Sequence, residues 1–189
     1  MASFLACQVT PEQVAAARRG ERKAQEALYR EYSPAVFTLA MRIVSHREAA
    51  EEVLQDTFIE VLSKLDGFRG QAPLGAWIRR IAVNKALMFL RSGWRRYARP
   101  LEAVAEPGAA GDSGDEHGLG DALAQLSPTA RAVVWLHDVE GYTHKEIGEM
   151  MKKSQSFSKS QLSRAHRRLR ELIDEDTGDI SCMRALNNC

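Results

Sequence analysis

Residues 48–65 carry an apolar repeat that a helix would place along one side of the chain. At one hundred degrees per residue, one face collects Val53, Leu54, Thr57, Phe58, Val61, Leu62 and Leu65. A second face carries an acid at every fourth position: Glu48, Glu52, Asp56 and Glu60. Like charges at this spacing repel by roughly a few tenths of a kcal/mol per pair. The repeat therefore predicts an amphipathic helix whose acidic face is either solvated or bound to a basic partner surface.

A loop and a helix without acids follow this segment. Residues 66–75 contain Gly67, Gly70, Pro73 and Gly75, and we expect helix to resume near Pro73 because proline suits a first turn. Residues 77–99 contain no Asp or Glu and seven cations: Arg79, Arg80, Lys85, Arg91, Arg95, Arg96 and Arg99. Such a segment favours an anionic partner.

The cationic helix also has two predicted faces. The expected buried side, on which Lys85 intrudes, consists of Trp77, Ile78, Ile81, Ala82, Met88 and Phe89. Arg80, Asn84 and Arg91 share a narrow sector beside Trp77. Guanidinium groups bind phosphates, an amide bonds a base edge and an indole stacks on bases. This sector therefore predicts a DNA-reading face, although Trp77 alone is also compatible with a core position.

The segments around this block complete a first helical domain, predicted over residues 8–97. Helix is expected at 9–19, with Thr10 as cap and Pro11 in the first turn, and at 21–44, where Pro34 would kink or divide it. Residues 98–120 are rich in Gly, Pro, Ala and acids and predict a flexible linker.

Residues 121–175 predict a helix-turn-helix domain. Ser127 is a helix cap and Gly141 a helix end, while Thr143 and Glu146 form a capping box. A polar turn then precedes a long helix whose apolar repeat is Leu162, Ala165, Leu169, Leu172 and Ile173. The fold class is therefore all-α, with two small helical domains joined by a linker.

The long helix of the second domain is strongly cationic. Residues 150–170 contain no acid and carry Lys152, Lys153, Lys159, Arg164, Arg167, Arg168 and Arg170. Because the start of a recognition helix faces base edges, we expect Phe157, Lys159, Ser160 and Gln161 to read bases and Arg164, Arg167 and Arg168 to contact phosphates. The helix could begin after Ser154, Ser156 or Ser158, so its register stays open.

The termini and the cysteines predict an intracellular protein. The start of the chain lacks the basic segment and apolar run of a signal peptide, and no window approaches the roughly 20 apolar residues of a membrane span. Cys7, Cys182 and Cys189 are odd in number and far apart, which favours a reducing cytoplasm. Residues 176–189 are expected to be a disordered tail.

Neither an enzyme nor a metal or cofactor site is expected. The chain has no HExxH motif, phosphate loop or nucleophile elbow. His137, His144 and His166 are dispersed in the sequence, without acidic or thiol partners at ligand spacing. The formal net charge of +1 says little about partners, because the charges are segregated into acidic and basic segments.

Three motifs stand in a fixed order: QDTF at residues 55–58, FRG at 68–70, and W-I-x-R-I-A-x-N at 77–84. With this order, residues 50–91 resemble the core domain of the extracytoplasmic-function (ECF) sigma factors of bacterial RNA polymerase. The resemblance implies that the acidic helix docks on the polymerase clamp, through Glu48, Glu52, Gln55, Asp56 and Glu60. It also implies that the loop with Phe68, Arg69 and Trp77 helps to separate promoter strands, and that Asn84 and its neighbours Arg80, Lys85 and Arg91 read the minus-ten element.

Residues 141–150 (GYTHKEIGEM) and 159–172 (KSQLSRAHRRLREL) likewise resemble the promoter-upstream domain of that family. The turn departs from the pattern, because the family usually places apolar residues where Lys153, Gln155 and Ser158 stand. The resemblance implies a transcription initiation factor that binds core RNA polymerase and promoter DNA and is restrained by an anti-sigma factor. The alternatives are a helix-turn-helix regulator acting without replacing a sigma factor, and a module that only sequesters another factor.

Overall fold

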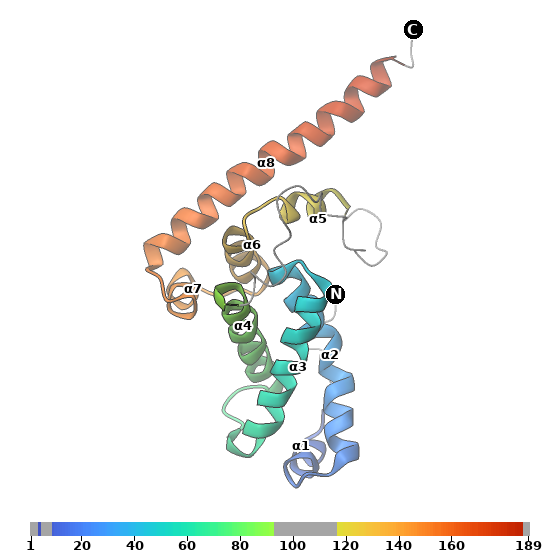
Figure 1. Cartoon of the computed structure of the whole chain (residues 1–189), viewed down its shortest axis with the longest axis vertical. Coiled ribbons are helices and arrows are strands. Elements are labelled where there is room, and N and C mark those ends of the chain that lie inside the picture. Colours follow the sequence, from blue (N-terminus) through green and yellow to red (C-terminus); the bar gives the residue numbers. More distant parts are fainter. Residues whose placement is uncertain (1–3, 5–8, 93–116, 187–189) are drawn as a thin grey trace. The chain divides into compact units, whose positions relative to one another are not determined.

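Helices make up the ordered secondary structure of this protein. The computed structural model describes residue 4, residues 9–92 and residues 117–186, and within these ranges there is no strand (Figure 1). Cys7, Cys189, the cations at 95, 96 and 99, and the predicted linker up to residue 116 lie outside the described residues. The chain separates into two compact units, Met1–Ala98 and Arg99–Cys189. The predicted all-α class with two helical domains is therefore confirmed.

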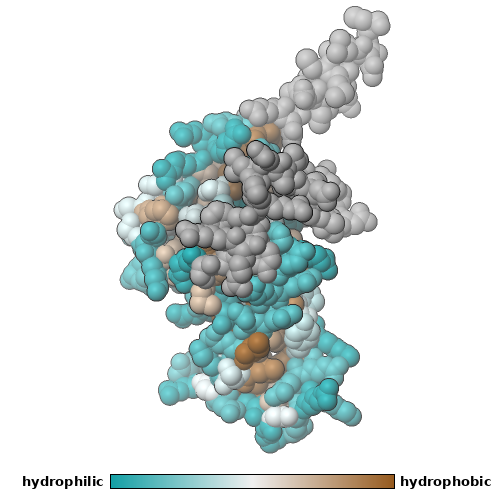
Figure 2. Space-filling model, in the orientation of Figure 1, coloured by the Kyte–Doolittle hydropathy of each residue, from teal (hydrophilic) through white to brown (hydrophobic). Residues whose placement is uncertain are grey.

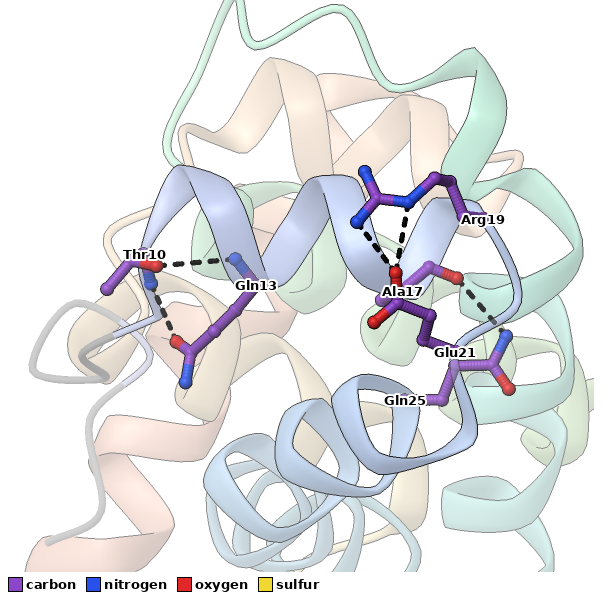
Figure 3. A network of polar contacts seen from close by, with 6 residues as sticks. All are labelled: Thr10, Gln13, Ala17, Arg19, Glu21 and Gln25. Atoms are coloured by element: carbon purple, nitrogen blue, oxygen red, sulfur yellow. Dashed lines mark hydrogen bonds and ion pairs between the residues drawn. The ribbon is translucent and has the colours of Figure 1, made fainter.

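The first unit opens with the short helix α1, Pro11–Arg18. Thr10 and Gln13 form a reciprocal capping box: the Gln13 N–H donates to Thr10 Oγ1 at 3.3 Å, and the Thr10 N–H donates to Gln13 Oε1 at 2.9 Å (Figure 3). At the other end Gln25 Nε2 donates to the carbonyl of Ala17 at 3.2 Å, which ties α1 to the next helix. The expected cap at Thr10 and the first-turn proline are both present.

Three long helices pack on one another to form the core of this unit: α2 (Arg22–Val44), α3 (Arg47–Lys64) and α4 (Leu74–Ser92). Pro34 lies inside α2, which is not divided there. A 3₁₀ turn, η1 (Leu65–Gly67), leads from α3 into the loop before α4. The core contains Leu28, Val36, Leu39, Ile43, Val53, Val61, Ile78 and Val83, each at most 2% exposed.

The buried faces follow the predicted periodicity with one correction. On α3, Val53, Thr57, Phe58 and Val61 are buried, as is Leu65 at the start of η1, and Leu54 and Leu62 are half-buried. On α4, Met88 was expected inside but is 44% exposed, whereas Val83, Ala86 and Leu87 are buried. Because α4 packs on both α2 and α3, its buried arc is wide and centred near Ala82 and Ala86, and Met88 falls outside that arc.

Lys85 enters the buried arc of α4 together with an acid from α3. Its Nζ lies 2.9 Å from Glu60 Oε2, and Lys64 Nζ lies 2.6 Å from Glu60 Oε1. Hydrogen bonds from Lys64 and then Lys85 lower the pKa of Glu60, while partial burial opposes them. The ion pair thus explains how a charged side chain, 19% exposed, is accommodated where the periodicity predicts an apolar one.

The second unit contains α5 (His117–Ala124), α6 (Pro128–Val134), the π-helical turn η3 (Trp135–Val139), α7 (His144–Met151) and α8 (Gln155–Leu186). Helices α5, α6 and α7 all pack against α8. Helix α5 begins four residues before position 121, where the second domain was expected to start. The core is formed by Val133, Leu136, Ile147, Leu162, Ala165, Leu169 and Leu172.

Two expectations for the end of α8 differ from the structure. Ile173 was placed in the buried repeat but is 41% exposed, so the covered part of α8 ends at Leu172. The tail from residue 176 was expected to be disordered, yet α8 continues to Leu186. Once a helix is nucleated, each further residue adds a backbone hydrogen bond at little cost, and Met183, Ala185 and Leu186 are good helix formers.

The turn between α7 and α8 depends on Gly148. A Cβ atom at this position would lie 3.0 Å from the carbonyl oxygen of Lys153 and 3.1 Å from the carbonyl carbon of Ser154. The Lys153 N–H donates to the Gly148 carbonyl at 2.8 Å, and Lys152 has a positive φ of 55°. The chain therefore folds tightly back over Gly148 to begin α8.

The exposed surface is mainly polar. The face visible in Figure 2 is largely hydrophilic, with small apolar patches. The exposed large apolar side chains of the described residues are Tyr29, Ile59, Met88, Val139 and Ile173. Across those same residues no helix combines the length and the apolarity that crossing a membrane requires.

Removing the cap of α7 should destabilise the second unit. Thr143 Oγ1 accepts from the Glu146 N–H at 3.3 Å, and Glu146 Oε2 accepts from the Thr143 N–H at 2.8 Å. Thr143→Ala should therefore lower the free energy of unfolding by about 1 kcal/mol, as measured by urea unfolding followed by circular dichroism. Thr143→Ser, which keeps the oxygen, should remain close to the parent, and an equal loss in both variants would contradict the capping role.

Glu60 should contribute stability only while it is ionised. Its lowered pKa means that the contribution is present above the ordinary value of 4.5 and is lost as pH falls through the folded-state pKa. Glu60→Gln should therefore lower the free energy of unfolding by about 0.5–1 kcal/mol near pH 7 and have almost no effect near pH 3. In a Lys85→Met background the loss near pH 7 should shrink; an undiminished loss would show that the α3–α4 ion pair is not its source.

Candidate nucleic-acid and polymerase interfaces

The predicted DNA-reading sector of α4 is exposed. Arg80, Asn84 and Arg91 are all exposed on the side of the helix that faces away from α2 and α3. Met88, which was expected in the core, lies instead at the edge of this sector, next to Trp77 on the helical wheel, and is exposed. The sector therefore presents two guanidinium groups, one amide and one apolar side chain to solvent.

The loop before α4 is held from two directions. The rings of Phe68 and Trp77 are 5.2 Å apart at 39°, so the indole is half-buried against the loop rather than in the centre of the core. Arg18 of α1 donates from Nε to the Leu65 carbonyl at 3.1 Å and from Nη2 to the Phe68 carbonyl. Arg69, next to these contacts, is exposed. No local sequence pattern indicates this role of Arg18, because its partners are 47 and 50 positions away.

The residues predicted to bind polymerase share the outer side of α3. Gln55 is exposed, Glu48 has a side chain 66% exposed, and Glu52 and Asp56 are half-buried. Glu60 differs from the others, since two lysines neutralise it. Ile59, which is 69% exposed, lies in the middle of this acidic face and was not singled out by the sequence.

The structure selects one of the three possible starts for α8. The Phe157 N–H donates to Ser154 Oγ at 3.1 Å, so Ser154 is the helix cap. With this register Lys159 and Ser160 are exposed, while Phe157 and Gln161 are half-buried. Lys153 lies over the Phe157 ring, with Nζ 5.9 Å from its centroid. Ser158, in contrast, is fully buried.

The arginines along α8 form an exposed cationic strip. Ser163, Arg164, Arg167, Arg170 and Glu171 line a shallow hollow of about 420 Å³. Arg168 is exposed too, but its Nη1 lies 3.3 Å from Glu171 Oε2. Arg164 and Arg167 are therefore better placed than Arg168 to attract a phosphate, because a neighbouring carboxylate competes for Arg168.

The histidines that are dispersed in the sequence come together in the second unit, where two of them share Asp138 as a partner. Asp138 lies 2.7 Å from His137 Nδ1 and 2.6 Å from His166 Nε2, and the rings of His137 and His144 stack 4.5 Å apart. The π-helical turn η3 and the packing of α8 create this cluster, which sequence spacing could not reveal. Among the residues that the structure describes, no group of three or more His, Cys, Asp or Glu side chains is arranged to hold a metal ion.

Arg131 is a charged core residue that the sequence analysis also missed. It is 6% exposed, and its Nη1 lies 3.4 Å from the carbonyls of Ala124 and Leu126. Burial lowers the pKa of Arg131 to about 10. The guanidinium joins α6 to the end of α5 rather than facing DNA.

Two protein families match the chain, one in each of the two units. Residues 28–96 match the family described as Sigma-70 region 2, and residues 117–169 match Sigma-70, region 4. The first match includes α3, the loop and α4, and the second includes α7 and the start of α8.

Similar proteins and structures agree with these matches. RNA polymerase sigma factor CarQ of Myxococcus xanthus is 32% identical over 163 residues, covering 84% of this chain and 94% of CarQ. ECF RNA polymerase sigma factor SigM of Mycobacterium tuberculosis is 30% identical over 164 residues, covering 86% of this chain and 83% of SigM.

Among solved structures, sigma factor RpoE of Bartonella quintana, in complex with the anti-sigma factor NepR, superposes with a TM-score of 0.56 at 28% identity, covering 75% of this chain and 91% of RpoE. CnrH, in complex with the cytosolic domain of CnrY, superposes with a TM-score of 0.51 at 22% identity, covering 87% of this chain and 97% of CnrH, and it supports the fold alone. On this evidence the chain belongs to the ECF group of the sigma-70 family, the transcription initiation factors that give RNA polymerase its promoter recognition.

Proposed function

We propose that this sigma factor uses three separate surfaces, one for core RNA polymerase and two for promoter DNA. The outer side of α3 docks on the polymerase, the exposed sector of α4 with the preceding loop opens and reads the minus-ten element, and the start of α8 reads the minus-thirty-five element. The observation that carries the proposal is the division of each helix into a packed side and an uncovered side, with the predicted functional residues other than Lys85 outside the packed side.

The minus-ten surface combines Phe68, Arg69, Trp77, Arg80, Asn84 and Arg91. Arg80 and Arg91 attract the backbone, Asn84 bonds a base edge, and the Phe68–Trp77 pair offers aromatic faces on which an unpaired base stacks. Lys85 is also among the expected DNA contacts, but its charge is already paired with Glu60, whose Oε2 lies 2.9 Å from Lys85 Nζ. Its contribution to DNA binding is therefore smaller than that of Arg80.

The docking surface consists of Glu48, Glu52, Gln55 and Asp56, with Glu60 at its edge. Carboxylates in a row increase the association rate with a basic partner and restrict its orientation. Repulsion along α3 is then relieved in the complex, which explains why the acids are tolerated at four-residue spacing.

The upstream surface consists of Phe157, Lys159, Ser160 and Gln161 at the start of α8, followed by Arg164, Arg167 and Arg168. The register with Ser154 as cap places the first four in the opening turns, which in a helix-turn-helix approach the major groove. Arginine contacts to phosphate supply affinity without sequence preference.

The two units act on one promoter because the chain links them, so neither needs high affinity alone. We infer a cytoplasmic location, no catalytic step and regulation by an anti-sigma factor, the kind of partner that NepR is for the Bartonella quintana sigma factor. Transcription with purified core polymerase on a genomic promoter library tests the function as a whole. Promoter-specific duplex binding by the chain alone, with no stimulation of core polymerase, would favour the helix-turn-helix regulator instead.

Asn84→Ala should reduce run-off transcription from a cognate promoter by roughly tenfold, because a side chain that bonds a base edge is worth about 1–3 kcal/mol. Arg80→Ala should have a similar effect that diminishes at low salt, since a phosphate contact is screened by ions. Lys23→Ala removes an exposed cation from α2 and serves as the control. Full run-off by Asn84→Ala would remove the assignment of that residue.

Asp56→Lys should weaken the binding of core polymerase by about tenfold, because it places a cation opposite a basic partner surface. The measurement is retention of core polymerase on the immobilised sigma factor at two salt concentrations. Glu26→Lys makes the same charge change on an exposed part of α2 and should leave retention unchanged. If the Asp56 variant binds as well as the Glu26 variant, α3 is not the docking surface.

A further inference from the structure

Five side chains of the second unit form a closed circuit of contacts, here called the histidine circuit, that returns to α8. Ser158 Oγ lies 3.1 Å from His144 Nδ1, and the His144 ring stacks on His137 with centroids 4.5 Å apart at 19°. His137 Nδ1 lies 2.7 Å from Asp138 Oδ1, and Asp138 Oδ2 lies 2.6 Å from His166 Nε2. Helix α8 is thereby held at Ser158 and again at His166, about two helical turns further along.

The sequence places the hydroxyl group of Ser158 in the core, and the contact with His144 gives that hydroxyl a hydrogen-bond partner. Ser158 is fully buried, and a buried hydroxyl without a partner costs free energy. Here the His144 ring supplies the missing partner, and its position at the first residue of α7 brings it within reach of α8.

The histidine circuit lies next to the residues proposed to read DNA. Phe157, Lys159, Ser160 and Gln161 lie within one turn of Ser158. Successive residues of a helix point one hundred degrees apart, so a small rotation of α8 about its axis would present different side chains to the major groove. A polar contact at Ser158 resists such rotation more specifically than apolar packing does, because a hydrogen bond requires defined geometry.

We propose that the histidine circuit is a positioning device, in which His144 acts through Ser158 to fix the rotation of α8 and thereby decides which side chains read the upstream promoter element. The proposal rests on the function assigned to α8 in the previous subsection. His144 is a positioning residue and does not itself read DNA.

The histidine circuit includes a side chain, His144, whose protonation affects the stability of the circuit. The titratable or charged groups that face His144 are His137 and Asp138 from η3 and Lys159 from α8. Partial burial, followed by the charges of His137 and Lys159, lowers the pKa of His144 below its ordinary 6.5, and Asp138 opposes this shift only in part. The closed circuit therefore favours neutral His144, so an opened circuit binds a proton more readily as pH falls below 6.5.

The contact between Asp138 and His166 responds differently over the same pH range. Burial raises the pKa of Asp138, but the hydrogen bonds from His166 and His137 outweigh burial and lower it below 3.8. Asp138 thus stays ionised near neutral pH and continues to hold His166. Mild acid should therefore weaken the hold on α8 at Ser158, because the closed circuit disfavours a charged His144, while the contact at His166 persists.

The test uses the full-length sigma factor with core RNA polymerase and measures run-off transcription from two templates. One template carries the intact minus-thirty-five element and the other a scrambled one, and the ratio of their yields reports upstream discrimination. His144→Leu orphans the Ser158 hydroxyl and should lower this ratio by about tenfold, the effect of roughly one mismatched base pair. An unchanged ratio in a folded His144→Leu protein overturns the proposal.

Two further variants separate positioning from simple stability and keep the test decisive if His144→Leu does not fold. Adding Ser158→Ala to His144→Leu removes both polar partners and should restore most of the ratio near pH 7.5, because no buried hydroxyl is then left unpaired. His144→Asn offers Ser158 a partner that does not titrate. The wild-type ratio should fall between about pH 7.5 and about pH 6.0, whereas that of His144→Asn should stay level.

The outcomes also distinguish this proposal from the function on which it rests. If the wild-type protein does not prefer the intact element at all, the assignment of α8 fails and the positioning proposal falls with it. If the wild-type protein discriminates and His144→Asn shows the same pH dependence, α8 keeps its function and only the role of His144 is removed.

Discussion

Burial of the apolar face of α3 is the constraint on which the first unit depends. Val53, Phe58 and Val61 can leave water only if α2 and α4 both pack against that face. This packing fixes the outward direction of every other residue on α3 and α4. The acids of α3 and the Arg80–Asn84 sector of α4 lie outside the core for the same reason, since they occupy the sides that the packing does not cover.

Polar groups inside the helical cores extend this constraint. Lys85 is tolerated in the buried arc of α4 because Glu60 faces it, Arg131 because two carbonyls accept from it, and Ser158 because His144 reaches it. Each of these pairs joins two different elements. The pairs therefore define how the helices are aligned, which apolar contacts alone specify less sharply because they are not directional.

The features that depend on local chemistry are the ones that the sequence predicted correctly. Helix limits at Thr10, Ser127 and Thr143 followed from capping chemistry, which acts within four residues. The exposed sector of α4 followed from the helical period. Errors occurred where a distant element decided the outcome: Met88 is exposed because α4 packs on two helices rather than one, and Ile173 because the covered part of α8 ends before it.

The sequence by itself determined the all-α class, the caps, the segregation of charge and the family, because these depend on local hydrogen bonds, helical periodicity and motif order. It left open the register of α8 among three serines, and it gave no hint that Arg18 holds the loop before α4 or that Asp138 joins His137 to His166. Only the tertiary structure decided these points. The physical reason is that each is a contact between side chains brought together by packing, across sequence separations that no local pattern encodes.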